Sequence, residues 1–369
     1  MAAADEHIQG EYRFLPQEHV VFGVGSLARL AGEIERIGGA RALIITGSSL
    51  ATKTDVVANV TEALGTYYAG TFDGIRQHAP GSGVVQATEA ARAIAADVLV
   101  SVGGGSPIDA TKAVALALAQ ESGVFLPQIA IPTTLSAAEF SHLVGVTNEE
   151  RRAKTGFADT RVAPRIVILD ARLTLPTPLR LWLSSGIRSL DHAVETLYAA
   201  GAHPISDVLA LEAIRRLFAE LPRCMEHPDD LDVRTELQLA AWMSFFGEVN
   251  TPMGLSHNLG RRMGATYNVP HGITSCITLP HVMRYLVHQA TPQLAAIARA
   301  LQLSEAGPSD IDAALIAADA VSDLIGRLGL PRHLSEVGVG EGDLHDIALA
   351  TVGDSPQLAE VEQLLARML

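Results

Sequence analysis

The stretch from residue 97 to residue 114, DVLVSVGGGSPIDATKAV, decides the fold. A β-rich run at its start changes into an Ala-rich run at its end, which predicts a strand followed by a helix. Between the two lie three consecutive glycines, Gly103, Gly104 and Gly105. Glycine lets a backbone turn tightly and approach a ligand closely, and a turn alone needs fewer glycines than this. The turn is therefore a candidate binding loop, although a well-made turn without a ligand is the structural alternative.

The start of the helix after the glycines suits an anion. We predict Ser106 as the N-cap, Pro107 at the first helical position and Asp109 as the partner that completes a capping box. A helix N-terminus offers unpaired N–H groups and the positive end of the helix dipole, both of which favour a pyrophosphate. The spacing matches neither GxGxxG nor a Walker loop. We predict that residues 103–106, together with Asp109, bind a cofactor pyrophosphate.

The alternation of strand and helix continues on both sides of this stretch. Helical runs separate further β-rich runs at residues 19–25, 41–49, 65–72, 128–134 and 165–170. Strict alternation implies a mostly parallel sheet that is covered by helices on both faces.

From about residue 180 the chain changes character. Long Ala/Leu-rich segments, such as 207–221 and 234–249, carry apolar residues at i, i+3 and i+4, and β-branched runs almost disappear. We therefore predict an α/β dinucleotide-binding domain with a parallel sheet over residues 1–175. An all-helical catalytic domain is predicted over residues 176–369.

Two further turns could contact the same cofactor. Thr133 and Thr134 follow the strand at 128–132, where they are either cofactor ligands or a helix cap. After the strand ALIIT, folds selective for NAD often place an acid that binds the ribose hydroxyls. This chain has Gly47, Ser48 and Ser49 there, with Lys53 nearby, so a 2′-phosphate is tolerated and NADPH as well as NADH is expected. Lys154 is one more cofactor-binding candidate.

Composition and charge exclude several classes of protein. The net charge of −14 argues against nucleic acid or an acidic membrane surface as the main partner. Two cysteines, Cys224 and Cys276, give neither a disulfide framework nor a Cys-based metal site. No signal peptide and no apolar run of ~20 residues is visible, so a cytoplasmic protein without a membrane partner is expected.

The segment GIRSLDHAVE, residues 186–195, places four polar side chains on one helix face, at i, i+3, i+4 and i+7: Arg188, Asp191, His192 and Glu195. An acid four residues before a His would be half of a metal site, but a cation occupies that position. The simplest interpretation of Arg188 is an i, i+3 salt bridge to Asp191 on an exposed turn. Asp191 and Glu195 could also orient histidines.

A second polar cluster lies between residues 254 and 285, where His257 and His271 are candidates for one pocket if a helix ends near Gly264 and restarts after the segment NVPHG. With this cluster, the motifs GGGSPIDATK, IPTT, GIRSLDHAVE, GLSHNLG and YNVPHGITSCITLPHVMRY together resemble the iron-containing (group III) alcohol dehydrogenase superfamily. The similarity runs from VVFGVGS almost to the C-terminus. The segments KTGFADTRVAPRIVILDARLTLPTP and GIRSLDHAVETLYA look most like the maleylacetate reductase branch.

The resemblance implies a site in the cleft between the two domains. Metal-dependent members of the superfamily use an Asp and three His as ligands. The three His positions fall on His192, His257 and His271, whereas the Asp position falls on Arg188 and a further His position falls on Arg261. These two departures predict a site without a metal; if a metal is present, the three histidines hold it.

The chemistry expected of this site is hydride transfer to a small anionic substrate. A cation can replace a metal as the group that holds developing negative charge, and Arg188 and Arg261 would also attract a carboxylate. The resemblance implies reduction of a double bond conjugated to a keto group, with His257 as proton donor and His192, His271 and the arginines orienting the substrate. A homodimer is expected, because exposed β-edges in this superfamily commonly pair.

Three alternatives remain open at this point. The first is a metal-dependent (Fe/Zn) alcohol dehydrogenase in which Asp191 or a water replaces the missing ligand. The second is a lyase of the dehydroquinate synthase type, although the helical half is poor in the lysines that a phosphate substrate needs. The third is a protein that binds the cofactor without catalysis.

Overall fold

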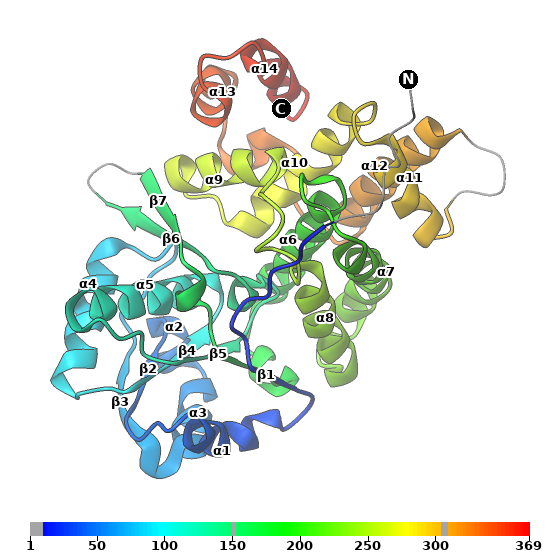
Figure 1. Cartoon of the computed structure of the whole chain (residues 1–369). Coiled ribbons are helices and arrows are strands. Elements are labelled where there is room, and N and C mark those ends of the chain that lie inside the picture. The colour runs from blue at the N-terminus through cyan, green and yellow to red at the C-terminus, as the bar shows by residue number, and fades with distance from the viewer. Residues whose placement is uncertain (1–9, 150–152, 304–308) are drawn as a thin grey trace, which may run out of the picture.

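The computed structural model describes residues 10–149, 153–303 and 309–369, with the backbone alone for residues 153–155 and 265. Two parts are visible in Figure 1: a sheet with its covering helices in blue to green, and a helical part in green to red. Within the described residues, no helix is both long enough and apolar enough to cross a bilayer.

The sheet has the parallel architecture that the sequence predicts. Its six strands run in the order β1-β8-β5-β4-β2-β3, and every neighbouring pair is parallel. The strands are β1 (His19–Phe22), β2 (Ala42–Ile45), β3 (Tyr68–Phe72), β4 (Val98–Gly103), β5 (Gln128–Pro132) and β8 (Ile166–Leu169).

Helices cover both faces of the sheet (Figure 1). On β2, Ile44 packs in the core beneath α1 (Leu30–Arg36) and α3 (Val56–Leu64). Its neighbours Leu43 and Ile45 pack in the opposite core, beneath α4 (Gly81–Ala93) and α5 (Gly105–Ser122). Successive side chains of a strand point to opposite faces, so a continuous apolar run is what a doubly covered strand requires. The short helix α2 (Ser48–Lys53) follows β2.

An antiparallel hairpin that the sequence analysis did not predict lies beside the sheet. Strands β6 (Leu143–Asn148) and β7 (Ala153–Ala158) pair with each other, and Gly145 lies opposite Gly156. In Figure 1 the hairpin rises from the sheet domain towards α9. It therefore approaches the helical part on the side that carries the candidate histidines.

The helical part has one continuous apolar core. Its helices are α6 (Leu179–Tyr198), α7 (Pro204–Glu226), α8 (Leu231–Ser244), α9 (Leu255–Tyr267), α10 (His271–Tyr285), α11 (Thr291–Ala300), α12 (Asp310–Arg327), α13 (Leu344–Val352) and α14 (Leu358–Ala366). All strands of the described residues end before α6 begins, whereas the exact boundary at residue 175 stays a prediction.

Two helix ends differ from the sequence-based expectation. The helical run 234–249 stops at Ser244, because Phe245 leaves the helix with φ −124° and packs against the ring of His192. The helix that was expected to end near Gly264 continues to Tyr267, where Asn268 closes it in the left-handed conformation. The next helix begins at His271 itself rather than after it.

Candidate active site

The three glycines form the junction of β4 and α5 at the carboxyl end of the sheet, where ligands bind in open α/β sheets. Gly103 has φ 138°, which favours glycine. A Cβ at Gly104 would lie 3.0 Å from Cγ2 of Thr134, so the two cofactor turns are in close contact. Among the described residues, the buried hydroxyls of Thr134 and Ser136 beside this loop have no hydrogen-bond partner. Unsatisfied hydroxyls beside a helix N-terminus fit a pyrophosphate.

The helix of this loop begins earlier than the sequence predicts. Helix α5 starts at Gly105 with an extended Gly104 as N-cap, which places Ser106 and Pro107 at its second and third positions. The hydroxyl of Ser106 instead accepts a hydrogen bond from the backbone N–H of His78 at 3.0 Å. Ser106 as N-cap is therefore wrong, whereas its contact with the cofactor stays a prediction.

Asp109 does not complete a capping box. Its carboxylate lies 3.6 Å from Nζ of Lys112, which is fully buried and donates hydrogen bonds to the carbonyls of Ala138 and Leu143. Burial lowers the pKa of Lys112, and the charge of Asp109 opposes that shift. A buried ammonium needs a nearby anion, so the carboxylate of Asp109 pairs with Lys112 and does not cap the helix. Its contact with the cofactor stays a prediction.

The second cofactor turn is fixed to α6. The backbone N–H of Leu135 donates to the hydroxyl of Ser185 at 3.0 Å, and Ser189 donates to the carbonyl of Leu135 at 2.5 Å. Thr177 donates to the carbonyl of Thr133 at 2.7 Å. The turn that contains Thr133 and Thr134 therefore lies against the helix that carries Arg188.

The turn after β2 is open to solvent. Gly47 is the N-cap of α2, and Ser48, Ser49 and Lys53 are exposed on that helix. A Cβ at Gly47 would lie 3.0 Å from a backbone carbonyl, which explains the glycine. The side chain of Lys154 lies outside the described residues, so its predicted role has no structural account.

Arg188 lies in a polar network and is largely buried rather than exposed on the surface. Its Nη1 donates to the hydroxyl of Ser275 on α10 at 3.1 Å and lies 3.6 Å from Oδ2 of Asp191. Asp191 is fully buried and accepts hydrogen bonds at Oδ2 from Ser275 (2.6 Å) and Ser256 (3.0 Å). The i, i+3 pair that the sequence suggested does form, but on a buried face, so the expected exposed turn is wrong.

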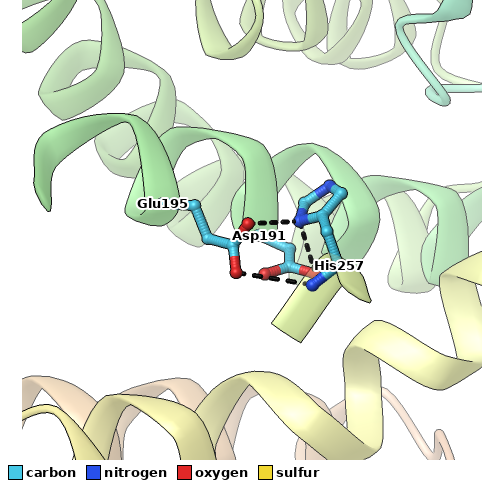
Figure 2. Close-up of side chains that lie close together, drawn as sticks. All are labelled: Asp191, Glu195 and His257. Atoms are coloured by element: carbon cyan, nitrogen blue, oxygen red, sulfur yellow. Dashed lines mark hydrogen bonds and ion pairs between the residues drawn. The ribbon is translucent and has the colours of Figure 1, made fainter. Parts of the chain in front are cut away.

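Glu195 caps helix α9 from α6. Its carboxylate accepts the backbone N–H groups of Gly254 (2.6 Å), Ser256 (2.8 Å) and His257 (3.4 Å). A Cβ at Gly254 would lie 2.6 Å from this carboxylate, so a larger residue there would displace it. Figure 2 shows Nδ1 of His257 between the two acids, 2.7 Å from Oε2 of Glu195 and 3.4 Å from Oδ2 of Asp191. Neither approach has the alignment of a hydrogen bond, so both are electrostatic contacts.

Burial shifts the protonation equilibria of this cluster. It raises the pKa of Glu195 to about 7 and also raises the pKa of Asp191. The pKa of His257 falls to about 3 through burial and the charge of Arg188, and the pKa of His192 falls well below its ordinary value. Burial lowers the pKa of Arg188 as well. At neutral pH both imidazoles are uncharged, and the arginine is the cation of the cluster.

The three predicted histidines have different neighbours. His192 stacks between the rings of Phe245 and His257, at centroid distances of 3.9 and 4.7 Å. His271 begins α10, and its ring meets the ring of His78 edge-on at 5.5 Å. His78 comes from the loop after β3 and was not predicted, although the segment RQHAPG before a helix offered a weak signal.

These residues do not fit the metal-ligand set that the resemblance implies. Among the described residues, one group of three side chains has its ligand atoms within 4.8 Å of one another, and it is Asp191, Glu195 and His257 rather than the three histidines. In that group Glu195 already accepts three backbone N–H groups, and Arg188 lies beside Asp191.

Arg261 lies one turn after His257 on α9 and is exposed. A Cβ at Gly156 on β7 would lie 3.1 Å from its Nη2, so the guanidinium reaches the hairpin. The charge of Arg261 also lowers the pKa of Arg188, although less than burial does. The two arginines therefore interact electrostatically. That both of them contact a substrate stays a prediction.

Comparison with known families matches both parts of the chain. Residues 16–171 match the family described as iron-containing alcohol dehydrogenase. Residues 182–366 match the C-terminal part of the Fe-containing alcohol dehydrogenase family.

Individual relatives span nearly the whole chain. Maleylacetate reductase 1 of Cupriavidus pinatubonensis is 32% identical over 94% of this chain and 92% of its own. A maleylacetate reductase of Burkholderia cepacia is 36% identical over 87% and 85% of the two chains. The crystal structure of maleylacetate reductase from Agrobacterium tumefaciens is 30% identical, covers 98% of this chain and 99% of its own, and has a TM-score of 0.84.

Proposed function

Because this chain belongs to the iron-containing alcohol dehydrogenase family, in its maleylacetate reductase branch, we propose that it reduces a small carboxylate-bearing enone or keto acid without a metal. It is an oxidoreductase that uses NADH or NADPH. The observation that carries this proposal is the largely buried guanidinium of Arg188. It contributes a fixed positive charge to the histidine cluster. A fixed cation can stabilise the negative charge that develops on a reduced carbonyl or enone oxygen.

The cofactor supplies the hydride when it is bound. Residues 103–106 would hold its pyrophosphate, because the glycines allow close approach and the first turn of α5 presents N–H groups. Thr134 would donate a further hydrogen bond from its buried hydroxyl. Gly47 and Ser48 would lie beside the adenosine ribose, at the end of the strand next to β4.

The substrate would be held by cations and protonated by an imidazole. Among the described residues the guanidinium of Arg188 donates one hydrogen bond, to Ser275, which leaves further N–H groups for a substrate oxygen. Arg261 would attract the carboxylate from the hairpin side. His257 would deliver the proton, since a bound carboxylate raises the pKa of a nearby imidazole from the low value it has in the free protein.

The test is oxidation of NADH and NADPH with a panel of substrates, with maleylacetate and other enone acids on one side and simple aldehydes on the other. We expect turnover with the acids that survives chelation. Arg261→Met should raise the KM for the acid at least tenfold, while Arg262→Met, its exposed neighbour, is the matched control. Metal-dependent turnover of aldehydes with no turnover of the acids would overturn the proposal.

One observation favours a second candidate, a metal-dependent alcohol dehydrogenase. Asp191, Glu195 and His257 supply a nitrogen and two carboxylates within 4.8 Å of one another, a donor set that a divalent ion can use. Glu195 already accepts three backbone N–H groups, so a metal at this group would compete with them for its carboxylate oxygens. Alcohol oxidation that depends on added iron or zinc would favour this candidate.

We also propose that the chain is a cytoplasmic homodimer. The outer edges of β1 and β3 have no strand partner among the described residues, and Phe22 at the β1 edge is exposed. Such edges are commonly covered by another chain. Light scattering coupled to gel filtration should give twice the mass of 39.0 kDa, and a monomer at micromolar concentration would contradict the proposal.

A further inference from the structure

The loop after β3 holds two consecutive non-glycine residues in the left-handed conformation. His78 has φ 64° and Ala79 has φ 46°. Non-glycine residues in this conformation are strained, and strain of this kind persists where the surroundings fix it and often marks a functional site. The pair therefore requires a physical reason.

Hydrogen bonds from two sides fix this loop. The backbone N–H of His78 donates to the hydroxyl of Ser106 at 3.0 Å, within the phosphate loop. Thr147 on β6 donates its hydroxyl to the carbonyl of His78 at 2.8 Å and its N–H to the carbonyl of Ala79 at 3.1 Å. The strained residues therefore connect the first turn of α5 with the hairpin.

The imidazole of His78 reaches across to the helical part. Its ring meets the ring of His271 at 5.5 Å with an interplanar angle of 84°, an edge-to-face contact. On α9, a Cβ at Gly264 would lie 2.8 Å from Cε1 of His271, so the His271 ring is confined there as well. One contact of the His271 ring thus comes from the domain that holds the cofactor loop.

We propose that His78 is a positioning residue, which sets the orientation of the His271 ring and couples that ring to the cofactor loop through Ser106. The inference rests on the proposed function, in which His271 orients the substrate. A cofactor pyrophosphate at residues 103–106 would fix Ser106, and with it the backbone of His78. The His271 ring should then respond to cofactor binding through His78.

The test uses His78→Asn, because Asn adopts the left-handed conformation more readily than most residues and keeps the backbone while it removes the ring. His78→Gly is the second variant, since glycine has no strain at this φ and keeps the chain folded if Asn does not. His281→Asn, a partly buried histidine further along α10, is the matched control. Cofactor affinity, kcat and KM are measured for each protein, together with the imidazole NMR signals of His271 with and without NADP⁺.

We expect cofactor affinity within threefold of the wild-type value and kcat at least tenfold lower in both His78 variants. The His271 signals should shift on NADP⁺ binding in the wild type and in the control, but not in either variant. A His78→Asn protein with kcat within twofold of wild type, or with the His271 response intact at saturating NADP⁺, would overturn the inference. If the wild type reduces no substrate in the panel, the proposed function fails, while the NMR comparison still tests the coupling.

Discussion

Replacing Arg188 by Met tests whether this guanidinium is the internal counter-charge of Asp191. Methionine keeps the apolar stem and removes the cation. The side chain of Arg188 is 12% exposed and that of Asp191 is fully buried, so the change leaves a carboxylate in the protein interior without its cation. Removing one partner of a buried pair costs about 3–5 kcal/mol of unfolding free energy. Asp191 keeps the hydrogen bonds from Ser256 and Ser275, so we expect the lower end of that range.

Urea denaturation at pH 7.5 measures this cost. Arg188→Met should lose about 3 kcal/mol, and adding Asp191→Asn should restore most of it, because the uncompensated charge is then gone. Arg215→Met is the control, since Arg215 pairs with Glu212 on an exposed face of α7 and such pairs contribute about 0–1 kcal/mol. An Arg188 variant as stable as the control, or a double variant no more stable than Arg188→Met, would refute this account of the network.

Three further predictions concern the cofactor domain. Gly104→Val should weaken NAD(P)H binding more than tenfold, or ~1.4 kcal/mol, since even a Cβ would lie 3.0 Å from Thr134. Fluorescence titration measures the affinity, and an unchanged value in the folded variant refutes the assignment of this loop to the pyrophosphate. NADPH and NADH should give kcat/KM values within a hundredfold of each other, because Gly47 and Ser48 offer no acid to repel a 2′-phosphate. A larger preference for NADH argues against the predicted tolerance of this turn for NADPH. Burial raises the pKa of Glu139 to about 7 from 4.5. The free energy of unfolding of the wild type should therefore fall relative to that of Glu139→Gln as pH rises from 4.5 to 7, and the difference should stay constant above pH 7. The loss should reach roughly 3 kcal/mol in denaturation curves at pH 4.5 and 8, and a difference that does not change with pH contradicts it.

The sheet could be predicted because its signals are local. A doubly covered strand such as β4 needs apolar side chains on both faces, and the glycines after it interrupt that run in the sequence itself. The hairpin β6–β7 was not predicted, because the glycines at its centre weaken the β-pattern. Helix ends were less certain for a similar reason: Phe245 leaves α8 to pack on His192, a contact that no local pattern indicates.

The side-chain network around Arg188 could be predicted in part from the sequence, whereas its long-range contacts could not. Helical spacing correctly placed Arg188 and Asp191 together, because i, i+3 neighbours share a face. The burial of this face depends on two long-range interactions. Arg188 bonds to Ser275 on α10, and Glu195 caps α9. His78 was missed because the segment around it gives only a weak signal, and its left-handed backbone conformation cannot be read from residue types.

The metal content of the active protein shows whether an arginine takes the place of a metal at this site. The protein should be purified without added metal or chelator, and iron and zinc should be measured by mass spectrometry beside its turnover of an enone acid. The account predicts far less than one metal ion per chain, and turnover that chelation leaves unchanged. One bound iron or zinc per chain, with activity lost on chelation and regained with the divalent ion, would contradict it.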